Sequence, residues 1–206
     1  MPLSAVVKTE VSKNIEKYEG RIPHLYLDTV GRVTVGIGHM VPNKESMGAV
    51  TMYKKGTNNL LVLATDAEKH AEYDSIKKLS FGRGYGANSF KKHTTLIMKD
   101  VDMNAQRDKH IQSFYKELTG YYITANGFTA AFDAMPIEVQ KALFDMVFNL
   151  GITKLKNQYI KLNGSIKLEK WDDAAKQSNR IGISATRNKY VFDLFKAAHR
   201  KKPKAS

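Results

Sequence analysis

Apolar and polar positions near the N-terminus predict a helix followed by a β-hairpin. Four apolar residues recur there every three or four positions and so share one helical face: Val11, Ile15, Tyr18 and Ile22. Gly20 marks the end of this helix. Two short runs of β-type residues follow, at residues 25–27 and 32–35, with Asp28-Thr29-Val30-Gly31 between them. Because this separator has turn-forming residues at both ends, we expect the two runs to pair as a hairpin.

Beyond residue 99 the apolar spacing is helical, which predicts a larger, mainly helical part of the chain. One stripe runs through Met103, Arg107, Ile111, Phe114 and Leu118. Residues 137–150 are apolar on nearly every side, so we expect a buried central helix there. Two more helices are predicted, around residues 168–178 with Trp171 in the core and around residues 187–199. Helices together with a hairpin favour the α+β fold class.

Residues 42–95 have the least regular pattern of the chain. They combine a polar loop at residues 54–59, a short helix and the glycine-rich run Phe81-Gly82-Arg83-Gly84-Tyr85-Gly86. This run neither follows a clear strand nor opens a helix, and it lacks the lysine and hydroxyl pair of a P-loop. We therefore predict no nucleotide-binding site.

Composition narrows the classes of protein and partner. Thirty-three Lys and Arg against twenty Asp and Glu leave a net charge of +13, which attracts polyanions such as nucleic acid, anionic lipid or the bacterial cell wall. The absence of cysteine excludes disulfides, thiolate nucleophiles and cysteine-based zinc sites. No apolar run approaches the roughly 18 residues of a membrane span, and residues 1–10 do not resemble a secretory signal. We expect a protein made in the cytoplasm that needs another system to deliver it outside.

Two carboxylates and a hydroxyl are the candidate catalytic groups. Glu19 ends the first helix and Asp28 begins the hairpin turn nine residues later, so the chain can bring the two carboxylates opposite each other. An inverting glycosidase needs such a pair, about 6.5–9.5 Å apart, with a water molecule between them. Thr34 shares a strand face with Arg32, and its hydroxyl can help to hold that water. The residues alone are a weak signal, because Asp is common in hairpin turns and Glu on helices.

The same residues resemble the active-site signature of the T-even phage lysozyme family. The matching runs are Glu19-Gly20, Tyr26-Leu27-Asp28-Thr29-Val30-Gly31 and Thr34-Val35-Gly36-Ile37-Gly38-His39, with the family's spacing between them. Met146-Val147-Phe148-Asn149-Leu150-Gly151 is similar to the family's central helix and its glycine stop. Trp171-Asp172-Asp173-Ala174-Ala175 and Arg187 also follow the family's order. The resemblance covers about half of the chain, residues 1–40 and roughly 136–195.

The resemblance implies a lysozyme-like α+β domain over residues 1–206. Its small β-hairpin lobe would span about residues 20–95, including an insertion, and its larger helical lobe about residues 1–19 and 96–200. A cleft would separate the lobes, and residues 201–206 would form a basic tail. The inserted segment matches compact phage enzymes poorly. A muramidase domain with such an insertion is similar to bacteriocin-like and secretion-system effector versions of the fold, which leaves the delivery route open.

The resemblance also implies an inverting muramidase that hydrolyses the β-1,4 bond between N-acetylmuramic acid and N-acetylglucosamine in peptidoglycan. Glu19 would be the proton donor, Asp28 the second carboxylate and Thr34 the water-positioning residue, while Arg187 would pair with the catalytic glutamate. The substrate-binding positions are Met40, Phe148, Asn149 and Arg187, and Asn149 stands where a longer amide is usual. We expect a monomer without cofactor or metal, whose partners are peptidoglycan and an immunity or delivery protein. His39 has no metal-ligand spacing around it and is predicted to be structural, with Asp108 as a candidate partner.

Two other functions stay open. A lytic transglycosylase uses a glutamate without a second carboxylate, so Asp28 and Thr34 favour hydrolysis over that reaction. A basic module that binds wall polymers or nucleic acid without turnover would explain the net charge of +13.

Overall fold

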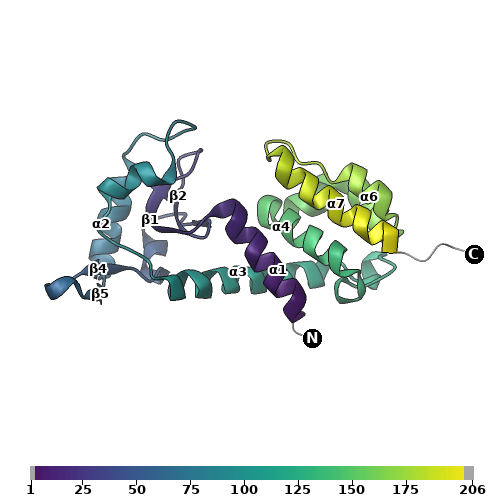
Figure 1. Cartoon of the computed structure of the whole chain (residues 1–206), viewed down its shortest axis with the longest axis horizontal. Coiled ribbons are helices and arrows are strands. Elements are labelled where there is room, and N and C mark those ends of the chain that lie inside the picture. The colour runs from purple at the N-terminus through teal and green to yellow at the C-terminus, as the bar shows by residue number, and fades with distance from the viewer. Residues whose placement is uncertain (1–2, 202–206) are drawn as a thin grey trace, which may run out of the picture. The chain divides into compact units, whose positions relative to one another are not determined.

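The computed structural model of the protein describes residues 3–201 (Figure 1). The predicted basic tail therefore lies outside the described residues, apart from Lys201 at the end of the last helix. The chain divides into two compact units. We call Glu19–Lys109 the β unit, and Met1–Tyr18 with His110–Ser206 the helical unit. The predicted boundaries between the two lobes were at about residues 19–20 and 95–96, whereas the units divide at residues 18–19 and 109–110. That the two units form one domain stays a prediction.

The β unit contains two small antiparallel sheets. Its strands are β1 (Ile22–Leu27), β2 (Val33–Gly36), β3 (His39–Met40), β4 (Tyr53–Lys55) and β5 (Leu61–Leu63). The first three strands form one sheet in the order β1-β2-β3, and β4 pairs with β5. Pairing of β1 with β2 confirms the predicted hairpin. The second hairpin was not predicted, because strands of three residues are too short to show a clear period of two.

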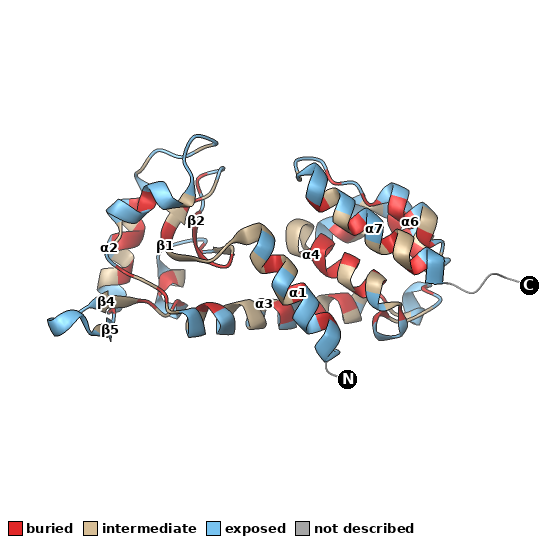
Figure 2. Ribbon diagram, in the orientation of Figure 1, coloured by how far each residue is buried: buried red, intermediate tan, exposed pale blue. Residues whose placement is uncertain are grey.

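One helix of the β unit, α2 (Asp66–Lys77), packs against the first sheet. A capping box starts it: the Thr65 hydroxyl accepts from the amide of Glu68, and the Glu68 carboxylate accepts from the amide of Thr65. Its buried side contacts β1 and β2 and is visible in red in Figure 2. The short helix predicted within residues 42–95 is thus confirmed. The surrounding core is formed by Leu25, Leu27, Val33, Val35, Ile37, Met52, Ile76, Phe90 and Leu96.

The helical unit is built around a buried central helix, as predicted. Its helices, two of which extend into the β unit, are α1 (Ala5–Glu19), α3 (Asp100–Tyr121), α4 (Ile137–Gln158), α5 (Ile160–Lys167), α6 (Trp171–Gln177) and α7 (Ala185–Lys201). Residues 142–147 of α4 are all buried. Gly151, with φ of 69°, interrupts the helix where a glycine stop was expected. Trp171 is only 2% exposed, which confirms its place in the core.

The fold class is α+β, as the sequence predicted: several helices accompany a small antiparallel sheet. Within residues 3–201, no helix is both long enough and apolar enough to cross a membrane.

Candidate active site

Glu19 lies at the junction between α1 and the first sheet. Gly20 follows it with φ of 74°, a left-handed conformation that lets the chain leave the helix and enter β1. Gly38, with φ of 66°, packs directly against the glutamate side chain. A Cβ added at this glycine would lie 2.9 Å from Oε2 and 3.1 Å from Cγ of Glu19. Only glycine fits this close approach, so the loop after β2 helps to position the carboxylate.

Asp28 is held by the backbone of its own turn. Its Oδ1 accepts hydrogen bonds from the amides of Val30, at 2.9 Å, and Arg32, at 2.8 Å. The backbone closes the turn as well, because the amide of Asp28 donates to the carbonyl of Arg32 and the amide of Gly31 donates to the carbonyl of Asp28. Among the described residues only Oδ1 accepts such bonds. The carboxylate is therefore oriented, while Oδ2 keeps its acceptor capacity.

Thr34 is tied to the same turn through Arg32. The threonine is only 4% exposed, and its hydroxyl donates to the carbonyl oxygen of Arg32 at 3.1 Å. The amide of Arg32 binds Oδ1 of Asp28, so one residue connects both predicted catalytic groups. Because the hydroxyl hydrogen of Thr34 is used in this bond, its oxygen meets any further partner as an acceptor.

Tyr26 brings the environments of both carboxylates together. It lies opposite Thr34 in the β1–β2 ladder, and Met40 lies opposite Thr34 on the other side, so the three side chains share one face of the sheet. Burial, and then the negative charges of Glu19 and Asp28, raise the pKa of Tyr26 to about 12. Its phenol is therefore neutral near pH 7 and is a hydrogen-bond donor. The sequence interpretation missed this role, although Tyr26 stands inside the motif that matched.

The predicted residues Met40 and His39 form the short strand β3. Met40 is 43% exposed at the edge of the row that it shares with Thr34. His39 lies opposite Val35 and is half-buried. Asp108 accepts hydrogen bonds from the side chain of Arg107. Among the described residues, no group of three or more His, Asp or Glu side chains is arranged to hold a metal ion.

The helical unit gathers the other predicted residues around one buried carboxylate. Asp145, on the central helix, forms ion pairs with two arginines. Its Oδ1 lies 2.6 Å from Nη1 of Arg180, and its Oδ2 lies 3.1 Å from Nε of Arg187. All three side chains are buried, and together they carry one net positive charge. Asn149 accepts from Arg180 at 2.5 Å, and the guanidinium of Arg187 lies 5.8 Å from the ring centre of Phe148.

The sequence interpretation missed both Asp145 and Arg180. A signal was present for Asp145, because an acidic residue in a helix that is apolar on most sides requires a partner. Nothing in the local pattern marks Arg180, whose surroundings are irregular. Arg187, Phe148 and Asn149 lie in the helical unit, whereas Glu19, Asp28 and Thr34 lie in the β unit. Pairing of Arg187 with the catalytic glutamate, and saccharide contacts by Phe148 and Asn149, stay predictions.

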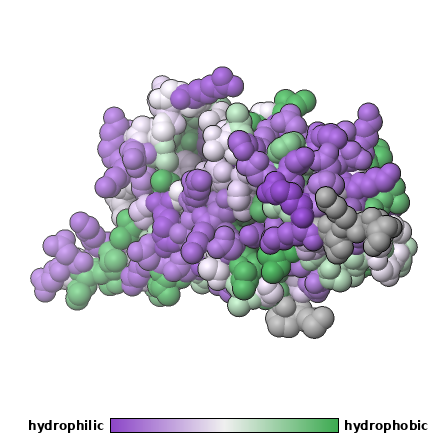
Figure 3. All heavy atoms as spheres, turned by 45° about the vertical axis from the view of Figure 1, so that its right-hand side comes forward, coloured by the Kyte–Doolittle hydropathy of each residue, from purple (hydrophilic) through white to green (hydrophobic). Residues whose placement is uncertain are grey.

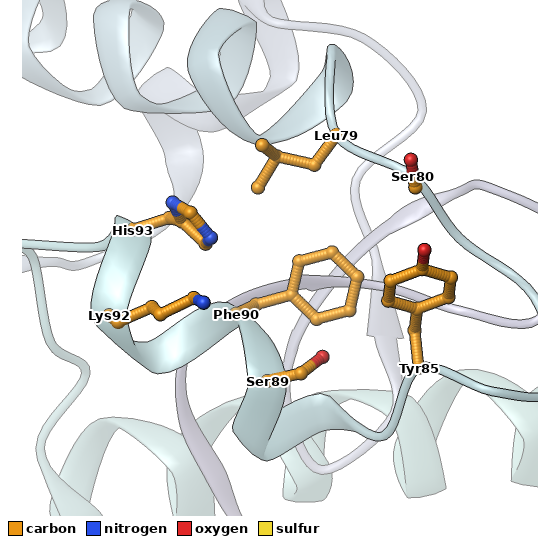
Figure 4. Close-up of a pocket in the computed structure, with 7 residues that line it drawn as sticks. All are labelled: Leu79, Ser80, Tyr85, Ser89, Phe90, Lys92 and His93. Carbon is orange, nitrogen blue, oxygen red and sulfur yellow. The ribbon is translucent and has the colours of Figure 1, made fainter.

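Two hollows in the β unit lie among residues 54–96 rather than at the carboxylates. One, of about 220 Å³, is lined by Leu79, Ser80, Tyr85, Ser89, Phe90, Lys92 and His93. Figure 4 shows the ring of Phe90 between Tyr85 and His93. The second, of about 340 Å³, includes Glu72 and shares His93 with the first. None of the residues that line them was predicted to act in the site.

Comparison with known proteins adds no family to these observations: no protein-family model matches the sequence, and no curated protein matches it.

Proposed function

We propose that the protein is a muramidase of the T-even phage lysozyme type, which hydrolyses the bond between N-acetylmuramic acid and N-acetylglucosamine in peptidoglycan. The observation that carries the proposal is the environment of Tyr26, where Glu19 and Asp28 both act on one phenol beside Thr34. Glycoside hydrolysis usually requires a pair of carboxyl groups that flank the scissile bond.

The hydrogen-bond pattern supports a role for Asp28 and Thr34 in holding water. Both present oxygen acceptors, since the Asp28 carboxylate has no proton to donate when ionised and the Thr34 hydrogen is bound to Arg32. A water molecule that donates its two hydrogens to these acceptors turns a lone pair toward a bound sugar. Asp28 then accepts a proton from this water as the oxygen adds to the anomeric carbon.

Glu19 is the general acid in this proposal. Its proton passes to the glycosidic oxygen as the bond to the anomeric carbon breaks, and the attacking water supplies the oxygen of the new reducing end. Water enters from the face opposite the leaving group, so the anomeric configuration inverts. The phenol of Tyr26 is neutral near pH 7, so it adds no charge beside these two carboxyl groups.

In this function the enzyme acts on a bacterial cell wall, which it reaches through a delivery system. Peptidoglycan strands carry stem-peptide carboxylates, and many walls carry phosphate-bearing polymers, which suit a chain with a net charge of +13. An immunity protein that blocks the site in the producing cell is a partner that fits this use.

The first test is digestion of purified peptidoglycan by wild type, Glu19→Gln and Asp28→Asn, followed by mass spectrometry of the soluble products. We expect reducing muramic acid ends from the wild type and turnover lower by about 10²–10⁴-fold in each variant, the range that general acid–base catalysis contributes. Glu10→Gln, on the exposed side of the same helix, is the matched control and should retain activity. Circular dichroism establishes that every variant is folded.

Each alternative function has its own outcome in this experiment. Products ending in 1,6-anhydromuramic acid would show that the protein is a lytic transglycosylase and not a hydrolase. If the wild type releases no soluble products, and if it binds peptidoglycan as strongly as Glu19→Gln does, the protein is a basic wall-binding module and not an enzyme. Proton NMR of the first products then distinguishes inversion from retention.

A further inference from the structure

The segment that does not match the phage enzymes contacts the turn that holds Asp28. Lys77, the last residue of α2, extends its ammonium to the carbonyl oxygen of Gly31 at 2.6 Å. Phe81 packs its ring against the same glycine, where an added Cβ would lie 2.7–3.0 Å from three ring atoms. Two side chains of this segment thus converge on one residue of the predicted catalytic turn.

Gly31 is the residue of this turn with the widest conformational freedom. Its φ of 79° is a left-handed conformation that glycine adopts freely, and it lies between the two residues whose amides hold Asp28, Val30 and Arg32. A glycine in such a position reverts readily to other conformations unless its surroundings hold it.

Lys77 and Asp28 bind opposite ends of one peptide group. The carbonyl of Gly31 and the amide of Arg32 belong to the same planar unit and point in opposite directions. Lys77 binds the oxygen of this unit, and Oδ1 of Asp28 binds its N–H at 2.8 Å. Rotation of the plane would break both bonds together. The positive charge of Lys77, bound to this carbonyl, also polarises the peptide group and strengthens the hydrogen bond of the Arg32 amide to the Asp28 carboxylate.

The contacts come from a part of the β unit that is itself well fixed. Glu72 on α2 accepts three hydrogen bonds, from the amide and hydroxyl of Thr95 and from the amide of Leu96. The buried His24 of β1 is hydrogen-bonded to the carbonyl of Ala87 at 3.0 Å. The bond to Ala87 holds the end of the glycine-rich run on β1, and the bonds of Glu72 connect α2 to residues 95–96. Phe81 is 52% exposed, so it is not a residue of the buried core. Its contact with Gly31 therefore calls for another role.

We infer that Lys77 and Phe81 are positioning residues for Asp28, which hold the Gly31–Arg32 peptide so that the carboxylate stays aligned with the attacking water; this inference rests on the proposed function. Neither side chain needs to touch the substrate. Loss of either contact frees the peptide to rotate, and Asp28 then samples orientations in which water is not aligned. The step that suffers is the chemical one, so kcat falls while KM changes little.

The test compares Lys77→Met, Lys77→Arg and Phe81→Ala with wild type. Lys77→Met keeps the length of the side chain and removes its charge, and we expect kcat to fall about tenfold or more, within the roughly 10²-fold that a misplacement near 1 Å can cost. Lys77→Arg keeps a cationic donor and should restore most of the rate. Lys78→Met, which changes the exposed neighbour at the end of the same helix, is the matched control and should behave as wild type.

A second measurement reads the peptide group directly and needs no activity. Hydrogen exchange of the Arg32 amide, followed by NMR, should become faster in Lys77→Met and Phe81→Ala and stay unchanged in Lys78→Met. All rates are measured well below the melting temperature of each variant, and Phe81→Leu replaces any alanine variant that does not fold.

The outcomes separate the two proposals. Wild-type kcat in Lys77→Met and Phe81→Ala, with unchanged exchange at Arg32, overturns the positioning role. A wild type that does not hydrolyse peptidoglycan overturns the proposed function instead, whatever the exchange rates are. Slower turnover with an equal change in KM, or with no rescue by Lys77→Arg, also contradicts the inference.

Discussion

The pKa of Tyr26 reports on the negative charges of the two candidate carboxylates, and it can be measured without a substrate. Its phenol lies in the sheet row with Thr34 and Met40, and its pKa is raised by burial, by Glu19 and by Asp28, in that order. Each negative charge disfavours a phenolate beside it. The state of the tyrosine therefore reports on both neighbours.

At this scale we predict that Glu19→Gln lowers the pKa of Tyr26 from its value of about 12, and that Asp28→Asn lowers it by less. The measurement is a spectrophotometric titration, with Tyr26→Phe used to identify the contribution of this residue. Glu10→Gln, the control on α1, should leave the contribution of Tyr26 unchanged, while it lowers the pKa of Tyr190, which Glu10 helps to raise. Equal curves for wild type and Glu19→Gln would show that the glutamate does not lie near the phenol.

The same shift has a consequence for stability, with a definite sign. The folded-state pKa is above the usual value of 10, so the folded protein holds this proton more tightly than the unfolded chain does. The stabilisation linked to Tyr26 is fully present below about pH 10 and is lost as the pH rises toward 12. Tyr26→Phe should remove this part of the alkaline loss of stability.

At the scale of elements, one carboxylate joins helices of the helical unit. Asp145 on α4 binds Arg187 on α7, accepts from Asn14 on α1 at 2.8 Å and pairs with Arg180 in the loop before α7. Charged groups removed from water in this way are tolerated only when each has its partner. A shared ion network therefore fixes how these helices pack.

We predict that Asp145→Asn destabilises the helical unit by about 3–5 kcal/mol, the usual cost of leaving buried charges without their counter-ion. Fluorescence of Trp171, the single tryptophan of the sequence, follows unfolding of this unit in urea. Asp173→Asn on α6 removes an ion pair with a largely exposed lysine and should cost less than about 1 kcal/mol. Similar losses in the two variants would contradict a structural role for the buried network.

At the scale of the whole molecule, the net positive charge is the property that we expect to govern binding to a cell wall. The net charge is +13, and most of the face shown in Figure 3 is hydrophilic. Such an excess attracts polyanions over a distance set by the salt concentration.

We predict that inactive Glu19→Gln binds purified cell walls strongly at about 0.1 M salt and weakly at about 1 M, because the screening length falls from about 10 to about 3 Å. Sedimentation of the protein with the walls measures this. Walls stripped of anionic polymers provide the control and should bind less at low salt. Binding that is independent of salt would assign recognition to uncharged contacts.

The sequence by itself determined the features that depend on neighbours along the chain. The end of α1 before Gly20, the β1–β2 hairpin, the buried α4 and the burial of Trp171 all follow from spacing within a few residues. Periodicity records which side of an element faces the core, and it does so wherever the element is long enough. The short strands β4 and β5 were missed because they are not.

Only the tertiary structure decided which polar groups meet. Lys77 and Gly31 are 46 residues apart in sequence, and Asp145 and Arg180 are 35 apart. Tyr26 was visible in the motif, but its relation to both carboxylates depends on where α1 ends and how the hairpin folds back. A charged or polar side chain carries no periodic signal that names its partner, because the partner is chosen by packing between elements.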